Sequence, residues 1–548
     1  MLKRFFLPAL LALGVLMFCA GCGDSEPKVQ PKAAIKEEAK PQAVKEVTVA
    51  IYRDGAMNVL DAATYNGPHF LFKMIYDGLV EDGGGGKILP QLATDWSIAA
   101  DGKTYTYTLR KNVKFSDGTS FNAEAAVFNL KRWANRGKYA AITASLMESF
   151  EAVDEYTLKV VYRDAAYPVL AELTYPRPVR FLSPASISPK EGDVLGVFAI
   201  PVGTGPWMLE SYEKDKQFSL VPNPHYWGEK PKLDRIVFKV VPDGQARMLA
   251  LQSGEVDILG GDLMGKIPMS NFLELRKSGK FETFTKGTLC SHFIAFNQNV
   301  KPFQDRSVRL AMNYAIDKKS IAEDLFDNMG LEATGMYQKG VPYATAANNY
   351  SFGNDKEKSR ALLKDAGYAD ADGDGVLEKD GQKLEFSFLL TAEEFPEWKP
   401  LAEFLQAEFA SVGIKANLKI LDRNGYAQAT LTPEARGFDI ALMRTASDSW
   451  MPHGSMLELF DFTMGKSWND ATLSAMIFKT LKTIDAAERQ KGYDDIMAFI
   501  SEQAITIPVY HPVTTFAVNP EKVVDFAIGG NSYAPVEWLQ LAVPQPAQ

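Results

Sequence analysis

The chain has 548 residues, which is too many for one hydrophobic core, so we expect at least two lobes. Its composition is that of a globular protein, with 46% apolar and 23% charged residues, and its formal net charge is −9. An acidic chain without a basic stripe binds nucleic acid poorly, and this excludes a nucleic-acid-binding protein.

The first segment of the chain is typical of a targeting signal. Lys3 and Arg4 precede the apolar residues 5–18, a run too short for an ordinary membrane-spanning helix. The sequence "CAGC" follows at residues 19–22 and resembles the bacterial lipoprotein box. This resemblance implies that residues 1–22 are a lipoprotein signal peptide and that Cys22 carries the lipid; a plain signal peptide is the alternative.

Residues 23–46 follow the signal and are rich in Lys, Glu, Ala and Pro. With almost no large apolar side chains they cannot fold alone, so we predict a flexible tether that spans on the order of 25–30 Å. Once Cys19 leaves with the signal and Cys22 carries the lipid, only Cys290 remains, and no intrachain disulfide is possible. Cys290 lies in the apolar run "TLCSHFIAFN" and is predicted to be a buried small side chain.

The body of the chain begins with strand patterns and one clear helix. Residues 47–52 ("VTVAIY") and 104–115 ("TYTYTLRKNVKF") alternate as strands do. Residues 121–133 read as a helix with Asn122 at its N-cap. "EDGGGGK" (81–87) reads as a hairpin turn, because it lacks the Ser/Thr and the following helix of a phosphate loop.

The second half alternates between helices and strands, which predicts an α/β lobe. Residues 305–317 read as a helix that presents Val308, Met312, Ala315 and Ile316 on one face. The next helix, 355–368, has Asp355 to cap its start and Gly367 to end it. The elements that follow are a strand at 383–390, a helix at 401–413, and strands at 414–421 and 437–444.

Catalytic motifs are absent from the sequence, so we do not expect an enzyme. There is no G-x-S-x-G, H-E-x-x-H, Walker loop or helix-opening G-x-G-x-x-G, and none of the five histidines is paired with another at short spacing. "DADGDGVLEKDG" (370–381) starts like a calcium loop, but its twelfth position is Gly381 in place of the required Glu. A polar turn that leads into a strand is favoured, with a weak calcium site as the alternative.

Several stretches together resemble one family. They are "YDGLVED…ILPQLATDWSIAADGKTYTYTLRKNVKFSDGTSFNAEAAVFNLKRW" (76–133), "VGTGPW" (202–207), "NPHYWGEKPKLDRIVFKVVPD" (223–243), "LQSGEVDIL" (251–259) and "VRLAMNYAIDKKSI" (308–321). In this order they are similar to the extracytoplasmic solute-binding proteins of peptide and nickel ABC importers (family 5, cluster C).

The family resemblance implies a fold, partners and a mode of action. The fold is an α/β, two-lobe periplasmic-binding-protein type II (cluster C) architecture with an extra subdomain on the first lobe. We expect lobe I at 47–286, lobe II at 287–504 and a return to lobe I at 505–548, with crossings near residues 285 and 505. Closure on a ligand acts as a hinge, and the partners are the ABC permease and ATPase subunits.

The segment "TYPRPVRF" (174–181) closely resembles the P-R-P-x-R-F segment of the nickel-binding branch. In that branch the first arginine holds a carboxylate of a small organic metal chelator, which implies that role for Arg177. A planar guanidinium makes two parallel bonds to a carboxylate, and the prolines on either side restrict the backbone that carries it. A structural arginine is the alternative for Arg177, and a structural role is favoured for Arg180.

The second-lobe segment "RTASDSWMPH" (444–453) matches the R-T-W-G-x-x-Y-x-P-H pattern of the nickel branch only in part. Ala446 replaces the tryptophan and Trp450 replaces the tyrosine. Tyr426 matches another aromatic of that pocket. The resemblance therefore implies Tyr426 and Trp450 as pocket walls, and we also place Lys138 and Arg444 in the ligand site.

Two histidines are predicted metal ligands. The best-known nickel relative has a ligand histidine just after this loop, but no histidine lies between His453 and His511 here. His69, at a cleft-facing position in the resemblance, and His511, just past the second crossing, could replace it. Two neutral imidazoles with a chelator's N and O donors suit Ni(II), Cu(II) or Zn(II). The alternative for both is an ordinary polar residue, and a structural role is favoured for the remaining histidines, His225, His292 and His453.

Asp448 leaves the ligand class open. Peptide-binding members of the family carry an aspartate four residues before the proline of this loop, where it pairs with the peptide's ammonium group, and Asp448 stands four before Pro452. Two hypotheses therefore remain. One is a lipid-anchored, extracytoplasmic receptor for a chelate of nickel or a similar divalent metal, with Ni²⁺ as cargo and no intrinsic cofactor; the other is a di- or oligopeptide receptor of the same kind.

Overall fold

The computed structural model of the protein describes residues 44–55, 60–63, 68–134, 146–176, 180–393, 395–431, 436–446, 451–463 and 465–544. The predicted signal peptide with Cys22 and nearly all of the predicted tether lie outside these ranges. Within them, no helix has both the length and the apolar character that crossing a membrane requires.

The main sheet has twelve strands, in the order β10-β11-β12-β1-β13-β22-β15-β21-β19-β20, and β14 and β16 also pair with β22. Its strands are β1 (Glu46–Ile51), β10 (Trp207–Glu213), β11 (Gln217–Pro222), β12 (Arg235–Val240), β13 (Ile258–Gly260), β14 (Glu282–Gly287), β15 (His292–Phe296), β16 (Gly330–Glu332), β19 (Glu385–Thr391), β20 (Lys415–Leu421), β21 (Ile440–Arg444) and β22 (Thr506–Val518).

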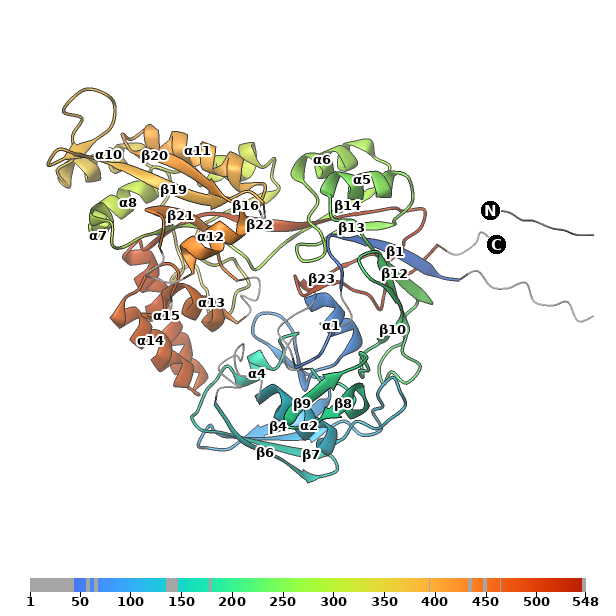
Figure 1. The fold of residues 1–548 in the computed structure, drawn as a ribbon. Coiled ribbons are helices and arrows are strands. Elements are labelled where there is room, and N and C mark those ends of the chain that lie inside the picture. Colours follow the sequence, from blue (N-terminus) through green and yellow to red (C-terminus); the bar gives the residue numbers. More distant parts are fainter. Residues whose placement is uncertain are drawn as a thin grey trace, which may run out of the picture. The chain divides into compact units, whose positions relative to one another are not determined.

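Strand β22 joins the two portions of this sheet, and it is the long red arrow in Figure 1. Its first half pairs with β15 and β16, and its second half pairs with β13 and β14. We call β1 and β10–β14 the first-lobe strands, and β15, β16 and β19–β21 the second-lobe strands.

The first-lobe portion shows why "VTVAIY" forms a strand buried on both faces. Val47, Val49 and Ile51 enter one apolar core, whereas Ala50 enters another on the opposite face. β1 pairs in parallel with β12 and β13, as expected for a sheet covered on both sides. Helices α5 (Gly244–Gln252) and α6 (Met269–Ser278) accompany these strands.

The second-lobe portion has the predicted α/β alternation. β19 pairs in parallel with β20 and β21. The predicted helical face is confirmed in α8 (Arg306–Tyr314) and just beyond its end, because Val308, Met312, Ala315 and Ile316 are all fully buried. Asp355 caps α10 (Lys356–Asp365) by accepting from the Lys358 N–H at 2.9 Å, and Gly367 takes a φ of 87° after the helix, as predicted.

A separate four-stranded antiparallel sheet, ordered β4-β5-β7-β6, carries the extra subdomain. It consists of β4 (Ala93–Ile98), β5 (Thr104–Leu109), β6 (Met147–Asp154) and β7 (Thr157–Tyr162). Helix α2 (Ala123–Ala134) packs on it, and the Asn122 side chain accepts from the Ala125 N–H at 3.0 Å, as predicted for an N-cap. Alternate residues Tyr105 and Tyr107 are buried in its core.

The remaining elements connect these layers. The other helices are α1 (His69–Ile75), α4 (Val169–Glu172), α7 (Lys301–Gln304), α9 (Lys318–Ser320), α11 (Trp398–Ala410), α12 (Arg423–Thr430), α13 (Pro452–Phe460), α14 (Ala471–Lys482) and α15 (Ala486–Glu502), with short helical turns at Pro184–Ser186 and Ile321–Leu325. The two-stranded hairpins are β2 (Val80–Asp82) with β3 (Ile88–Pro90), β8 (Ile187–Lys190) with β9 (Asp193–Phe198), β17 (Glu378–Lys379) with β18 (Gln382–Lys383), and β23 (Ile528–Asn531) with β24 (Ala534–Val536). The β2–β3 hairpin confirms the glycine-rich stretch as a turn.

Three of the quoted sequence motifs meet at Asp77, which is buried. Its carboxylate accepts from Gln91 Nε2 (2.9 Å), Thr204 Oγ1 (2.9 Å) and Trp227 Nε1 (2.8 Å). "GTGPW" needs glycine because a Cβ at Gly203 would lie 2.0 Å from the Ile75 carbonyl oxygen. The motifs therefore meet at one buried hydrogen-bonded carboxylate in the first lobe.

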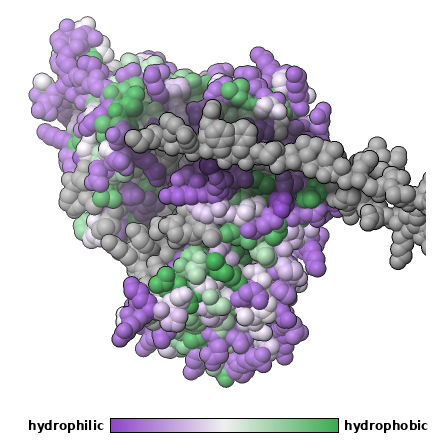
Figure 2. Space-filling view, turned by 45° about the vertical axis from the view of Figure 1, so that its right-hand side comes forward, coloured by the Kyte–Doolittle hydropathy of each residue, from purple (hydrophilic) through white to green (hydrophobic). Residues whose placement is uncertain are grey.

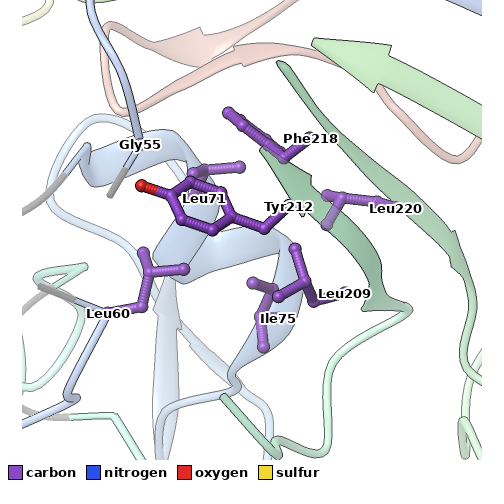
Figure 3. A pocket seen from close by; sticks show the side chains of 8 residues that line it. All are labelled: Gly55, Leu60, Leu71, Ile75, Leu209, Tyr212, Phe218 and Leu220. Atoms are coloured by element: carbon purple, nitrogen blue, oxygen red, sulfur yellow. The ribbon is translucent and has the colours of Figure 1, made fainter. Parts of the chain in front are cut away.

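One small void lies in the first-lobe core, between α1 and strands β10 and β11 (Figure 3). Apolar side chains that include Leu60, Leu71 and Phe218 surround it, and its volume is about 10 Å³. A void of this size holds at most one water molecule. On the outside, hydrophilic side chains cover much of the described surface in the view of Figure 2, in keeping with an acidic, water-exposed protein.

Candidate functional site

An aromatic cluster lies where first-lobe and second-lobe residues meet. Tyr175 and Tyr533, from the first lobe, pack with Met451, from the second lobe, and Ala171, Leu263 and Leu289 pack around them. We call these six residues, with His69, the junction cluster. Large aromatic side chains with a polar tip are the usual walls of a small-molecule site.

His69 is the polar member of this cluster and begins helix α1. Its ring stacks on Tyr533 at a centroid distance of 4.2 Å and meets Tyr175 edge-on at 5.9 Å. Its Nε2 lies 3.4 Å from the Tyr175 hydroxyl. The side chain is half-buried, so two tyrosines fix the orientation of the imidazole ring while part of it stays accessible.

The residues that flank the two predicted ligand-binding segments enter the junction cluster. Tyr175 precedes Arg177 in "TYPRPVRF", and Met451 directly follows Trp450. Arg177, Lys138, Asp448 and Trp450 themselves lie outside the described residues. The described residues of the two segments, Tyr175 and Met451, therefore lie in one cluster.

Arg180, at the other end of "TYPRPVRF", is buried. Its Nη2 donates to the Thr174 carbonyl at 2.8 Å, and its Nη1 lies 3.8 Å from the Glu81 carboxylate. The Phe181 N–H donates to the Asp77 carbonyl at 3.2 Å. Arg180 thus ties both ends of the segment to the first-lobe core, which matches the structural role that the sequence favoured.

A second contact between the lobes is charged. Lys266, from the first lobe, donates to Glu397, from the second, at 3.0 Å. Within the first lobe, Ser532 Oγ donates to Asp262 at 3.4 Å. The Lys266 ammonium lies 5.2 Å from the centre of the Phe395 ring. Burial raises the pKa of Asp262. Since Leu263 of the junction cluster is the next residue after Asp262, this charged group adjoins the cluster.

Arg444 ends strand β21 beside the same charged group. Its guanidinium carbon lies 5.5 Å from the centre of the Phe395 ring, and its Nη1 lies 3.5 Å from Cys290 Sγ. Cys290 is buried, as predicted, and its Sγ lies 3.0 Å from the Thr445 carbonyl. Cys290, just before β15, and Thr445, just after β21, therefore lie beside Arg444 at the lobe junction.

Tyr426 lies on α12 with its hydroxyl donating to the Leu442 carbonyl at 2.6 Å. Its ring meets Trp398 at 5.9 Å, and Trp398 Nε1 in turn donates to His292 Nδ1 at 2.9 Å. Burial, followed by the positive charges of Lys266 and Arg444, holds the pKa of His292 well below its usual value. His292 is a neutral acceptor in the second-lobe core, which fits the structural role that the sequence favoured.

A third contact between the lobes joins helix α4 to helix α13. His453 Nε2 lies 3.1 Å from Glu172 Oε1, and both side chains are 3% exposed. Beside them the hydroxyls of Tyr167 and Tyr493 are hydrogen-bonded to each other. We call the Glu172–His453 pair the clasp. It adjoins the junction cluster, because Ala171 precedes Glu172 and Met451 lies two residues before His453.

His511 belongs to a different environment from His69. It lies in β22 opposite Leu331 of β16, and it is 4% exposed. Burial, and secondly the positive charge of Lys318, lowers the pKa of His511 to about 4. Its Nδ1 has no hydrogen-bond partner among the described atoms. The ring is therefore neutral and able to bind a metal, but Leu331 and Lys318 beside it differ from Tyr175 and Tyr533, which hold the ring of His69.

The turn at Asp370–Asp374 leads into strand β17, as the favoured interpretation predicted. The carboxylates of Asp370, Asp372 and Asp374 come close together on the surface. The ammonium of Lys383 bridges two of them, at 2.8 Å from Asp372 Oδ2 and in contact with Asp374. A protein cation thus already balances part of this charge.

Sequence reasoning missed much of the junction. Tyr533, Asp262, Lys266, Glu397 and Glu172 belong to no motif that the sequence singled out. Tyr175 stood inside "TYPRPVRF" and could have been found from that segment. The others come from distant parts of the chain, and only the fold brings them together.

Comparison with known proteins identifies the class. The model of the bacterial extracellular solute-binding proteins, family 5 (middle region), matches residues 87–466. The nickel-binding periplasmic protein of Escherichia coli (strain K12) is 31% identical over 479 residues, covering 85% of this chain and 88% of that protein. The dipeptide-binding protein of the same organism is 26% identical over 486 residues, covering 82% and 85%. The structure of NikA from Brucella suis in complex with Fe(III)-EDTA matches with a TM-score of 0.82 and 28% identity, covering 91% and 100%.

The chain therefore belongs to the bacterial extracellular solute-binding proteins of family 5. It is an extracytoplasmic substrate-binding protein of an ABC importer and not an enzyme, and its partners are the importer's permease and ATPase subunits. The predicted family and the predicted two-lobe α/β fold are confirmed.

Proposed function

We propose that the protein captures a chelate of nickel, or of a similar divalent metal, and delivers it to the permease of an ABC importer. The observation that carries this proposal is the junction cluster, in which an accessible, tyrosine-held imidazole lies beside the flanks of both predicted ligand-binding segments. The similarity to a nickel-binding periplasmic protein over 85% of the chain supports the choice of metal.

The ligand carboxylate is assigned to Arg177. A guanidinium makes two parallel, charge-assisted bonds to a carboxylate, and these bonds select a planar anion. Arg180 supports this assignment by anchoring the same segment to the first-lobe core. Tyr426 and Trp450 form aromatic walls, and Lys138 and Arg444 supply positive charge for an anionic chelate.

The metal ligand from the protein is assigned first to His69. A neutral imidazole suits Ni(II), and the chelator supplies the remaining N and O donors. His511 stays a second predicted ligand. Its neutral form supports this role, whereas its separate surroundings favour His69 when a single histidine is used.

Closure of the lobes retains the cargo. The clasp and the Lys266–Glu397 pair both join side chains from the two lobes. Each contact exists only when the lobes meet, so a ligand that binds between them shifts the equilibrium toward the closed state. We propose that Cys22 carries the lipid that holds this receptor at the membrane.

A second candidate function is the capture of di- or oligopeptides. Asp448 favours it, because an aspartate at this position pairs with a peptide's ammonium group in peptide-binding members. The similarity to a dipeptide-binding protein supports it at lower identity. With Arg177 for the carboxylate, one site could hold both ends of a dipeptide.

Calorimetric titration separates the two functions. The protein is titrated with Ni(II) and L-histidine together, with Ni(II) alone, and with metal-free dipeptides. The proposal predicts tight binding of the ternary mixture only, weakened at least tenfold by Arg177→Ala and by His69→Ala. Tight binding of metal-free dipeptides, with no response to Ni(II) and histidine, would contradict it.

A further inference from the structure

A pocket opens between the lobes next to the clasp. Its volume is about 200 Å³. Tyr105, Tyr167 and Leu170 line it from the first lobe, and Tyr343, Met451 and Arg489 line it from the second. Packed interiors leave few voids larger than a water molecule, and an apolar cavity of about 150 Å³ can hold a benzene ring. We call this space the interlobe pocket; it is large enough for an aromatic ring.

The lining of the interlobe pocket is mainly apolar and aromatic, with one fixed cation. Arg489 donates from Nε to the Tyr343 hydroxyl at 3.0 Å, and from Nη1 to the carbonyls of Thr483 (3.1 Å) and Ile484 (2.7 Å). Its guanidinium carbon lies 4.5 Å from the centre of the Tyr167 ring. In the described part of the chain, Nη2 has no hydrogen-bond partner, so two oriented N–H donors remain for an acceptor.

The interlobe pocket continues from the predicted ligand site. Ala171 and Met451 belong both to its lining and to the junction cluster. His453 of the clasp lines it as well. Elsewhere the lobes touch closely, at the clasp and at the Tyr167–Tyr493 contact. The interlobe pocket is therefore a gap in an otherwise close contact between the lobes, and it lies directly beside the proposed ligand site at the junction cluster.

We propose that the interlobe pocket receives an arm of the transported ligand: an aromatic or aliphatic group of about phenyl size with an acceptor oxygen at its tip. This inference rests on the proposed function, because the arm extends from a ligand held at the junction cluster. Ala171 and Met451 pass the arm between the two spaces, Tyr105 and Leu170 pack against it, and Arg489 Nη2 donates to its tip. The protein therefore binds a ligand with such an arm more tightly than a single-residue chelate.

Histidyl dipeptides with Ni(II) test this by calorimetry. Histidyl-glycine has no arm, histidyl-phenylalanine has an apolar arm, and histidyl-tyrosine adds the acceptor oxygen. Burying a side chain of this size strengthens binding by about 10- to 100-fold, so phenylalanine should exceed glycine by that ratio. A hydrogen bond from a charged donor should give tyrosine a further gain of about tenfold.

Two variants and one control locate the effect. Leu170→Trp fills the pocket and should abolish the advantage of both arms while leaving histidyl-glycine binding unchanged. Arg489→Gln should remove only the advantage of tyrosine over phenylalanine, and it serves as the test if Leu170→Trp does not fold. Leu249→Trp, at a side chain that is 55% exposed on α5, is the matched control and should keep the wild-type ratios.

The outcomes separate this inference from the proposed function. Equal affinity for the three dipeptides in the wild type, or an arm preference that survives both Leu170→Trp and Arg489→Gln, would overturn the interlobe pocket as an arm site. The same arm preference without Ni(II) would support the pocket while contradicting the metal cargo. Binding that requires Ni(II) but ignores the arm would support the cargo and overturn the pocket.

Discussion

Breaking the clasp should weaken the binding of Ni(II) with L-histidine, a ligand that has no arm for the interlobe pocket. His453→Phe leaves the Glu172 carboxylate without its imidazole partner, and Glu172→Leu does the reverse. Both side chains are 3% exposed and only 3.1 Å apart when the lobes meet. In a separated state both side chains face water, so each single substitution acts on the equilibrium between open and closed lobes.

The size of the effect follows from burial. Removing one member of a buried hydrogen-bonded pair costs about 1–3 kcal/mol, because the remaining polar group loses this bond while it stays buried. A cost of about 1–3 kcal/mol that falls on closure weakens the apparent affinity by about 5- to 150-fold. The double variant Glu172→Leu/His453→Phe replaces both polar groups with apolar ones and should recover most of this loss, with a coupling energy of about 1–2 kcal/mol.

Calorimetric titration with Ni(II) and L-histidine measures affinity, and small-angle scattering measures how far the lobes separate. Lys482→Ala is the control. It removes a surface pair with Asp164 that also joins the two lobes but is 64% and 40% exposed, so it should cost less than about 1 kcal/mol. Single variants with wild-type affinity, or losses that simply add in the double variant, would refute the clasp.

Three further predictions concern stability, measured by urea unfolding. Gly203→Ala should lower the free energy of unfolding by more than about 3 kcal/mol, because its Cβ would lie 2.0 Å from the Ile75 carbonyl oxygen. Gly84→Ala has nothing within 4 Å of its Cβ and should lower it by only about 1 kcal/mol, for its φ of 79°. Similar losses in the two variants would contradict the close approach at Gly203. His292 has a lowered pKa in the folded state, so its contribution to stability is complete above about pH 6.5 and is lost as the pH falls below that value. His292→Gln should therefore reduce the slope of the unfolding free energy against pH below pH 6.5 by up to about 1.4 kcal/mol per pH unit. An unchanged slope would disprove that His292 is neutral in the folded protein. Asp355→Ala removes the α10 cap and should lower the free energy of unfolding by about 1 kcal/mol, a loss that Asp365→Ala, at the exposed other end of α10, should not reach.

Local elements of the fold were predictable where short-range chemistry dominates. The caps at Asn122 and Asp355 were read from single polar residues before apolar repeats, and both form as predicted. The helix at 401–413 was placed too late, since α11 starts at Trp398. Trp398 is buried against His292, so tertiary packing extends the helix beyond its periodic part.

The candidate site was less predictable because it depends on contacts between distant residues. Periodicity cannot show that Tyr533 stacks on His69, which lies more than four hundred residues earlier. The buried partner of His453 was equally hidden, since nothing in the sequence near Glu172 distinguishes it from a surface carboxylate. Motif resemblance indicated the segments around Arg177 and Trp450, whereas the lobe contacts that enclose them required the fold.

Native mass spectrometry of protein purified from cells without added chelators, combined with metal analysis, tests the central claim most directly. The proposed function predicts one divalent metal per chain, mainly nickel, together with the mass of a small organic chelator, and loss of both in Arg177→Ala. A bound peptide mass with no metal would contradict the metal–chelate function and establish the peptide receptor in its place.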